Sequence, residues 1–195
     1  MSSNSLSDYE LIQKFVEGDQ SCFEQLIYRH RNKVYAYISM YVRDNTLVED
    51  IFQDTFLKVL QSLRKGKYQD DGKFLSWVMR IAHNLIIDHF RKEKQMNIIS
   101  NDDSEVDLFN NKQLADSNAE DWIVNRQIKK DLRAIIDQLP PDQKEVVIMR
   151  SFAELSFKEI ADITGVSINT ALGRMRYALI NMRKIMEEKC ITLTA

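Results

Sequence analysis

The segment Ser156–Met182 restricts the fold of this chain more than any other. Ser156 and Glu159 have the S-x-x-E spacing of a capping box, in which each side chain satisfies a free backbone N–H of the other residue. The residues after this cap, FKEIADIT, form a short helical pattern that ends at Gly165. Glycine is the residue best able to adopt the positive φ of a tight turn, and Ser167 can cap the helix that follows. The segment therefore predicts a helix-turn-helix.

The second helix of this segment has two different faces. Apolar residues at helical spacing predict a face packed inside its own module: Ile168, Ala171, Leu172, Met175, Leu179 and Met182. The opposite face has short polar residues at its amino end and mostly basic ones later: Asn169, Thr170, Gly173, Arg174, Arg176, Tyr177 and Lys184. This order suits the major groove of DNA, where the first residues reach base edges and Arg or Lys meets phosphate. An ordinary two-helix corner with a solvated face has the same spacing, so both interpretations stay open.

Composition predicts that the whole chain is all-α. Five Gly and two Pro are few for a loop-rich β fold, whereas Leu, Ile, Lys, Glu, Gln and Met are abundant and favour helices. A run of about 18 apolar residues and a secretory signal are both missing, which predicts a cytoplasmic protein without a membrane partner. Cys22 and Cys190 have no second Cys or His at ligand spacing, so we expect neither a zinc site nor a disulfide framework. We also expect no other metal and no cofactor.

The distribution of charge predicts two modules. The net charge of −2 hides a stretch at residues 95–121 that has one Lys and seven Asp or Glu. This stretch is rich in Asn, Asp and Ser and has no sustained apolar periodicity, which favours a flexible acidic linker. It would join small helical domains at residues 8–94 and 122–189. The alternative is a solvated loop within one domain, although loops of this length are unusual in compact domains.

The third and fourth helices of the first module carry polar faces. Apolar spacing predicts four helices there: Asp8–Glu17, Ser21–Val42, one capped by Thr46 that runs to about Leu63, and Phe74–Lys94. On the third helix, Asp50, Gln53 and Asp54 share a face. Paired carboxylates could serve acid–base catalysis or a metal. His30, His83 and His89 match no ligand spacing, however, so a protein-docking surface or plain solvent exposure fits better.

The fourth helix has a basic and aromatic face. It comprises Lys73, Trp77, Arg80, Asn84 and Arg91, with Lys92 and Lys94 at the end of the helix. Single-stranded DNA is bound in this way, by stacking of bases on rings and pairing of phosphates with cations. Equally, Phe74 and Trp77 could be core residues beside solvated basic side chains. The residues alone do not decide between these interpretations.

Taken together, these segments resemble the extracytoplasmic-function group of bacterial sigma factors, the promoter-specificity subunits of RNA polymerase. VEDIFQDTF is similar to sigma region 2.2, and KFLSWVMRIAHNLIIDHFRK is similar to regions 2.3 and 2.4. LPPDQKEVVIMRSFAELSFKEIADITGVSINTA is similar to region 4. The resemblance spans about Asp8 to Lys189 and implies two helical domains, sigma region 2 and sigma region 4.

The resemblance implies a partner for each face. Asp50, Gln53 and Asp54 would dock on the coiled coil of the polymerase β′ subunit. Regions 2.3 and 2.4 would recognise and open the minus-10 element of promoter DNA, a role that involves Lys58, Trp77, Arg80, Asn84 and Arg91. Lys58 and Asn84 match family positions at a pocket for a flipped base, and Trp77 matches an aromatic residue beside the opened strand. Such flipping costs a few kcal/mol of lost stacking.

Region 4 would bind the minus-35 duplex and the polymerase β flap, while the acidic linker would run through the RNA-exit path. The group commonly has an anti-sigma factor. At Leu172 and Gly173 many relatives have a basic residue and Ser, so contacts there do not carry over and Arg174, Arg176 and Tyr177 are the better candidates. Two other classes of protein remain as alternatives: a stand-alone helix-turn-helix regulator that never engages polymerase, and a helical enzyme, for which no catalytic constellation is evident.

Overall fold

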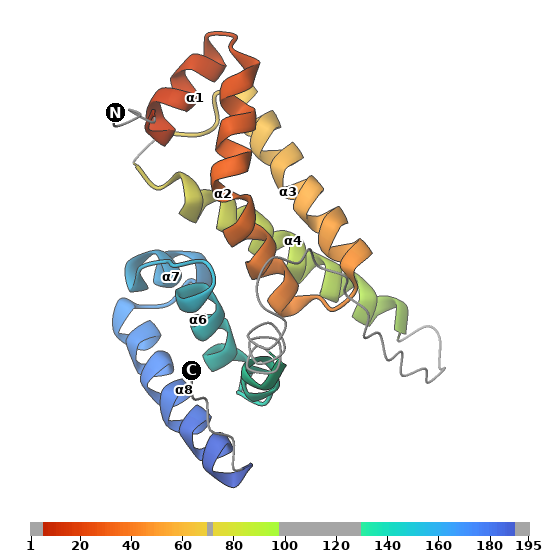
Figure 1. Cartoon of the computed structure of the whole chain (residues 1–195), viewed down its shortest axis with the longest axis vertical. Helices are drawn as coiled ribbons and strands as arrows, with labels where there is room; N and C mark the ends of the chain where they lie inside the picture. Colours follow the sequence, from red (N-terminus) through yellow and green to blue (C-terminus); the bar gives the residue numbers. More distant parts are fainter. Residues whose placement is uncertain (1–5, 70–71, 98–129, 190–195) are drawn as a thin grey trace, which may run out of the picture. The chain divides into compact units, whose positions relative to one another are not determined.

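The computed structural model describes residues 6–69, 72–97 and 130–189, and every regular element in these ranges is a helix. The chain divides into two compact units, residues 1–106 and 107–195 (Figure 1). None of the helices in the described ranges has both the length and the apolar character that a membrane span requires. The predicted all-α fold with two helical modules is confirmed.

The first unit contains four helices that pack on one another. They are α1 (Asp8–Val16), α2 (Gln20–Tyr41), α3 (Asn45–Arg64) and α4 (Phe74–Asn97). α2 contacts α1, α3 and α4, and α3 also contacts α4. The predicted cap of the third helix is wrong by two residues: Asp44 is the N-cap, and its carboxylate accepts a hydrogen bond from the backbone N–H of Thr46 at 2.9 Å. An Asp at this position accepts from the second helical N–H, as an N-cap requires.

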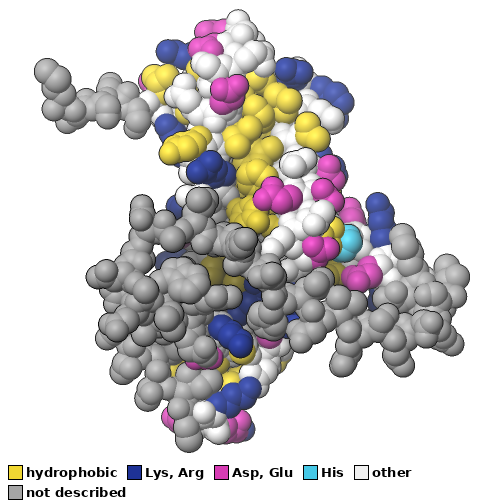
Figure 2. Space-filling view, turned by 45° about the vertical axis from the view of Figure 1, so that its right-hand side comes forward, with side chains coloured by type: hydrophobic (Ala, Val, Ile, Leu, Met, Phe, Trp, Pro, Cys, Tyr) yellow, Lys and Arg dark blue, Asp and Glu magenta, His cyan; other side chains and the backbone are white. Residues whose placement is uncertain are grey.

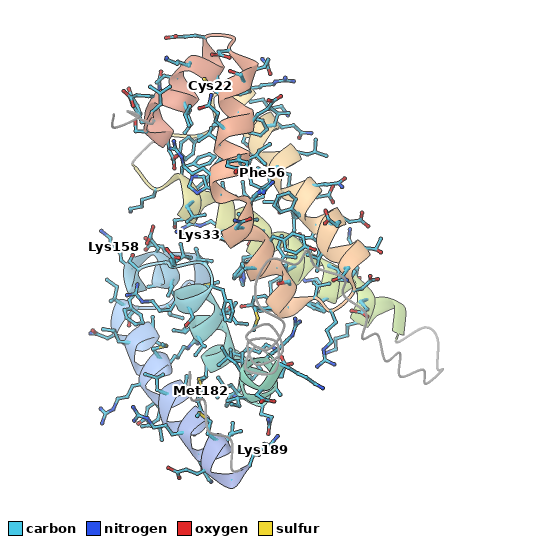
Figure 3. All side chains as sticks on the ribbon, in the orientation of Figure 1. Cys22, Lys33, Phe56, Lys158, Met182 and Lys189 are labelled. Carbon is cyan, nitrogen blue, oxygen red and sulfur yellow. The ribbon has the colours of Figure 1, made fainter. Side chains whose placement is uncertain are left out.

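Large side chains fill the core of the first unit. Tyr37 and Phe74 are the largest of those with almost no exposed surface, and Phe56 is also buried (Figure 3). Two histidines are buried with polar partners: His83 Nδ1 lies 3.0 Å from the Tyr37 hydroxyl, and His30 Nε2 lies 2.8 Å from Asp8 Oδ2. Buried polar groups need such partners, because an unpaired polar atom loses its bonds to water without compensation.

The second unit contains helical residues 130–137, followed by α6 (Pro141–Ser151), α7 (Phe157–Thr164) and α8 (Ile168–Glu188). Pro141 is at the first helical position of α6, where proline suits the backbone, so the predicted break at the two prolines is confirmed. The expected start of this module near Asp121 lies outside the described residues, as do residues 98–121 of the expected linker. Residues 95–97 belong to α4 rather than to the linker.

α7 and α8 form the predicted helix-turn-helix. The Ser156 hydroxyl accepts from the Glu159 backbone N–H at 3.3 Å, and the Ser156 backbone N–H donates to the Glu159 carboxylate at 2.8 Å. Gly165 ends α7 with φ +69°, in the left-handed region that glycine tolerates best. Ser167 then caps α8 by accepting a hydrogen bond from the backbone N–H of Thr170.

The inner face of α8 differs from the prediction. Its buried residues are Ala171 and Ala178, whereas Ile168, Leu172 and Leu179 are 44%, 44% and 42% exposed. The predicted apolar stripe was therefore correct for Ala171 but lies mainly along the flank of the helix. Small side chains at the contact let helices approach closely, so the packed face centres on the alanines.

Candidate nucleic-acid interface

α4 carries its predicted polar face along one side of the first unit. Lys73, just before the helix, and Trp77, Arg80, Asn84 and Arg91 are separated by three, four or seven residues, which aligns them on a helix. Arg80, Asn84 and Arg91 are exposed, and Arg91 also lies 3.6 Å from the Asp88 carboxylate. The face therefore presents an amide and cations to solvent.

Trp77 joins this face to the core. Its ring centroid lies 4.4 Å from that of Tyr68 and 5.9 Å from that of Phe74, and Tyr68 also contacts Phe74. Phe74 is a core residue with 2% of its surface exposed, whereas Trp77 is only partly buried. Neither sequence interpretation was complete, because the aromatic group belongs both to the core and to the surface.

Tyr68 was missed by the sequence reasoning. It lies in the polar loop RKGKYQDDGK, before α4, and helical periodicity does not extend to such a loop. The available signal was a single aromatic residue among charged and polar neighbours. Its ring supports the Trp77 ring from the side of the loop.

α3 presents the predicted acidic face. Asp50, Gln53 and Asp54 are all exposed, and Leu57, one further turn along, is 53% exposed. The first three make no hydrogen bond or ion pair with any residue that the structure describes. In the upper half of Figure 2, acidic side chains lie beside a band of exposed hydrophobic side chains. Lys58 is also exposed on this helix. Within the described ranges, no three His, Cys, Asp or Glu side chains form a group that could hold a metal.

The solvent face of α8 carries most of its predicted residues. Asn169, Thr170, Arg176 and Tyr177 are exposed, and Gly173 is partly exposed. Thr170 also shares a hydrogen bond of 2.9 Å with the Ser167 hydroxyl at the cap. Gly173 has no steric need to be glycine, because a Cβ there would have no neighbour within 4 Å.

Arg183 extends the basic part of this face and was missed by the sequence reasoning. It is exposed and lies seven residues after Arg176, which places the two on the same side of the helix. Neither makes an ion pair with another residue in the described ranges. The signal was present as the spacing Asn169, Arg176, Arg183. Lys158 is exposed near the start of α7 (Figure 3).

Arg174 does not lie on the face where it was predicted. Only 22% of its side chain is exposed, and its guanidinium lies 2.7 Å from Asp142 Oδ2 and 3.9 Å from Glu145 Oε2. Both acidic residues belong to α6. The placement on the solvent face is therefore wrong for this residue, because its charge is directed toward carboxylates of its own unit.

Comparison with known proteins finds relatives of both units. Residues 26–96 match the family model of Sigma-70 region 2, and residues 129–176 match that of Sigma-70, region 4. RNA polymerase sigma factor CarQ of Myxococcus xanthus is 28% identical over 177 residues, which cover 91% of this chain and 96% of CarQ. The ECF RNA polymerase sigma-E factor of Escherichia coli (strain K12) is 28% identical over 178 residues, covering 89% of this chain and 91% of that protein.

Two solved structures share the fold. CnrH, in complex with the cytosolic domain of CnrY, has a TM-score of 0.66 at 20% identity and covers 93% of this chain and 97% of CnrH. RpoE of Bartonella quintana, in complex with the anti-sigma factor NepR, has a TM-score of 0.67 at 19% identity and covers 85% of this chain and 96% of RpoE. The two family matches follow the order of the two units, and the sequence relatives span nearly the whole chain. The chain therefore belongs to the extracytoplasmic-function group of the sigma-70 family and is an RNA polymerase sigma factor.

Proposed function

We propose that this sigma factor docks on core polymerase through α3, opens the minus-10 element with α4 and reads the minus-35 element with α8. The observation that carries this proposal is that one unit exposes two faces: an acidic face on α3, which has no partner among the described residues, and a basic, aromatic face on α4. A stand-alone helix-turn-helix regulator needs only α7 and α8 to bind DNA and accounts for neither of these faces.

The docking surface consists of Asp50, Gln53 and Asp54, with Leu57 at its edge. The side chains are exposed, and the two carboxylates are not neutralised within the described part of the chain. Protein interfaces combine apolar and polar contacts, and the exposed Leu57 supplies apolar surface next to the acids. The proposed partner is the coiled coil of the polymerase β′ subunit. The carboxylates then recognise polymerase and have no catalytic role, so we propose that the protein is not an enzyme.

The minus-10 surface consists of Trp77, Arg80, Asn84 and Arg91 on α4, together with Lys58 on α3. Trp77 is held by Tyr68 and Phe74, so its exposed part can stack on an unpaired base without first being ordered. Stacking on an aromatic ring contributes about 1–3 kcal/mol per base, which offsets much of the cost of unpairing. Arg80 and Arg91 supply charge for the phosphates, and Lys58 and Asn84 lie at the pocket for the flipped base.

The minus-35 surface consists of Asn169, Thr170, Gly173, Arg176 and Tyr177. The first two are exposed in the first turn of α8, the part of a recognition helix that reaches base edges. Arg176 is exposed and has no ion-pair partner within the described ranges, so its charge is available to phosphate. Gly173 lets the backbone of α8 approach the groove closely. The same unit is proposed to touch the polymerase β flap.

The remaining partners are proposed from the relatives. CnrH is seen with the cytosolic domain of CnrY, and RpoE of Bartonella quintana is seen with the anti-sigma factor NepR. We extend an anti-sigma partner to this chain and place its activity in the cytoplasm, where core polymerase and promoter DNA are found. No cofactor is required. The acidic residues between 95 and 121 are proposed to occupy the RNA-exit path, because they carry the same sign of charge as RNA.

The test uses the full chain, purified core polymerase and gel filtration, followed by transcription from a promoter. We expect wild type to co-elute with core polymerase and to start transcription. Asp50→Arg combined with Asp54→Arg should abolish both. The matched control is Glu17→Arg combined with Glu24→Arg, which makes the same change of charge at exposed residues of the first unit and should co-elute normally. Survival of binding in the α3 variant, with helical content unchanged, would show that the docking surface lies elsewhere.

A further inference from the structure

Two arginines of α8 point in nearly opposite directions. Arg174 and Arg176 are two residues apart, so they are separated by about 200° around the helix axis. Arg176 is exposed, whereas the side chain of Arg174 is 22% exposed. Arg174 lies four residues after Thr170, so its position on the helix alone does not separate it from the proposed minus-35 surface. The contacts of its guanidinium group distinguish it from Arg176.

Arg174 is bound by two carboxylates of α6. Its Nη2 lies 2.7 Å from Asp142 Oδ2, and its Nη1 lies 3.9 Å from Glu145 Oε2. Asp142 and Glu145 are three residues apart and thus share one side of α6. The Glu145 side chain is 21% exposed and the Asp142 side chain is 66% exposed, so Arg174 joins one largely buried carboxylate and one solvent-exposed carboxylate of α6. Exposed pairs contribute little, but breaking a buried one leaves an uncompensated charge.

The neighbours of Arg174 show why this contact matters for the orientation of α8. Ala171 and Ala178, which precede and follow it by about one turn, are fully buried, and α8 has no large apolar residue in its buried set. Alanines permit a close approach of neighbouring helices but offer no large side chain whose shape would fix rotation, and the larger Met175 and Met182 of α8 are only partly buried. One turn further along, the Asn181 amide donates to Gln143 Oε1 at 2.7 Å. Polar links at 174 and 181 therefore resist rotation of α8 on α6.

The carboxylates of α6 also depend on Arg174. Burial raises the pKa of Glu145, the guanidinium of Arg174 opposes this shift, and the charge of Asp142 adds to it. Removal of Arg174 would leave two neighbouring carboxylates, one of them largely buried, without a cation between them. These two carboxylates repel each other within α6 and favour uptake of a proton by the buried one, while α8 loses its ionic link to α6.

We infer that Arg174 is a positioning residue, which fixes the rotation of α8 through Asp142 and Glu145 and thereby directs Asn169 and Arg176 toward DNA. Arg174 itself makes no contact with DNA. This inference rests on the proposed role of α8 in reading the minus-35 element, and it replaces the DNA contact that the sequence predicted for this residue.

A charge swap tests the inference in the complete holoenzyme. The probe is a promoter duplex that wild-type holoenzyme selects from a random-sequence pool. Arg174→Glu and Asp142→Lys should each weaken binding, the first by about tenfold or more, because each places like charges together. The double variant should recover affinity to within about threefold of wild type. A phosphate-binding Arg174 predicts the reverse: Asp142→Lys would not weaken binding, and the double variant would bind as poorly as Arg174→Glu. That result would overturn the inference.

The salt dependence of DNA affinity tests this inference separately from the proposed function on which it rests. Arg174→Gln should weaken binding without changing the slope of log affinity against log salt, whereas Arg176→Gln should reduce the slope by about 0.9. A reduced slope for Arg174→Gln would overturn the positioning role. No effect of Arg176→Gln on affinity or slope would instead reject the proposed contact of Arg176 with the minus-35 element. If Arg174→Glu unfolds the second unit, recovery of helical content and of DNA binding in the double variant still supports the inference, and failure of both overturns it.

Discussion

α2 in the first unit and α8 in the second have almost the same length but are held in different ways. α2 has 22 residues and buries eight of them, including Phe23, Tyr37 and Ile38. α8 has 21 residues and buries two, both alanines. Large buried side chains fix a helix by shape, because a rotation would open cavities and create clashes. A helix packed on alanines depends more on polar contacts, which one change of charge can break.

This difference suits the proposed tasks. Strand opening needs a rigid platform, since a mobile Trp77 would lose part of its stacking energy in becoming ordered. In α4, the buried ring of Phe74 contacts Trp77 and holds it in place. Reading of a duplex needs the right rotation of α8, and this depends on few side chains. The orientation of α8 is thus more sensitive to single changes than that of α4.

The largest expected effect comes from truncation in the core of the first unit. Phe74→Ala should lower the free energy of unfolding of this unit by about 3–5 kcal/mol, because it removes a buried ring and leaves a cavity. NMR-monitored urea unfolding follows the two units separately. Phe90→Ala, at a 39% exposed position of the same helix, serves as the control and should cost much less. Equal losses for the two variants would contradict the role of the buried Phe74 ring in holding the first unit together.

In the second unit, the stability should be sensitive to enlargement of a buried side chain. Ala178→Leu introduces a larger, branched side chain at a position with no exposed surface. We expect it to lower the free energy of unfolding of the second unit by about 1–3 kcal/mol in the same experiment. Leu179→Ala changes its exposed neighbour and should cost little. If the unit accepts the larger side chain at position 178 without loss, close packing of α8 on alanines is not what holds it.

Both units have a capping box, which allows a direct comparison. Ser7→Ala in the first unit and Ser156→Ala in the second each remove a side-chain acceptor at a helix start, and each should cost about 1 kcal/mol. Only Ser156→Ala should also weaken binding to promoter DNA, because it loosens the first helix of the helix-turn-helix. The measurement combines amide hydrogen exchange at α1 and α7 with DNA affinity. A similar loss of affinity in both variants would contradict this expectation.

The smallest expected effect is an opposite response of the two units to pH. Burial alone would raise the pKa of Asp8, but hydrogen bonds and charges from His30 and Arg29 together hold it below its ordinary value of 3.8. As the pH falls, Asp8 is therefore protonated in the unfolded chain before it is protonated in the folded one. The stability that the Asp8 carboxylate gives to the first unit is present above pH 3.8 and is lost as the pH falls through the folded pKa.

Glu145 should act in the other direction. Its pKa is raised above the ordinary value of 4.5 by burial, so the folded state binds the proton more tightly. The stability of the second unit should then fall as the pH rises from 4.5 through the raised pKa. Urea unfolding of each unit at several pH values measures both trends. Asp8→Asn and Glu145→Gln should each remove the trend of their own unit alone, and a trend that persists would assign it to other groups.

Much of the local structure followed from the sequence. The capping box at Ser156, the turn at Gly165 and the break at Pro141 were all predicted correctly, because each depends on backbone chemistry within a few residues. The exposed acidic face at Asp50 and Asp54 was also predicted, since helical spacing alone places these residues together. The resemblance of several motifs in order supplied the family.

What only the tertiary structure decided was which side of a helix faces its neighbour. Periodicity placed Leu172 and Leu179 inside and Arg174 outside, yet the packed face of α8 centres on Ala171 and Ala178, and Arg174 meets Asp142 of α6. The tertiary structure also places the ring of Tyr68, from a polar loop, against the ring of Trp77. A sequence sets the order of side chains around one helix axis, but the rotation of that helix is chosen by the shape and charge of the partner helix, which lies elsewhere in the chain.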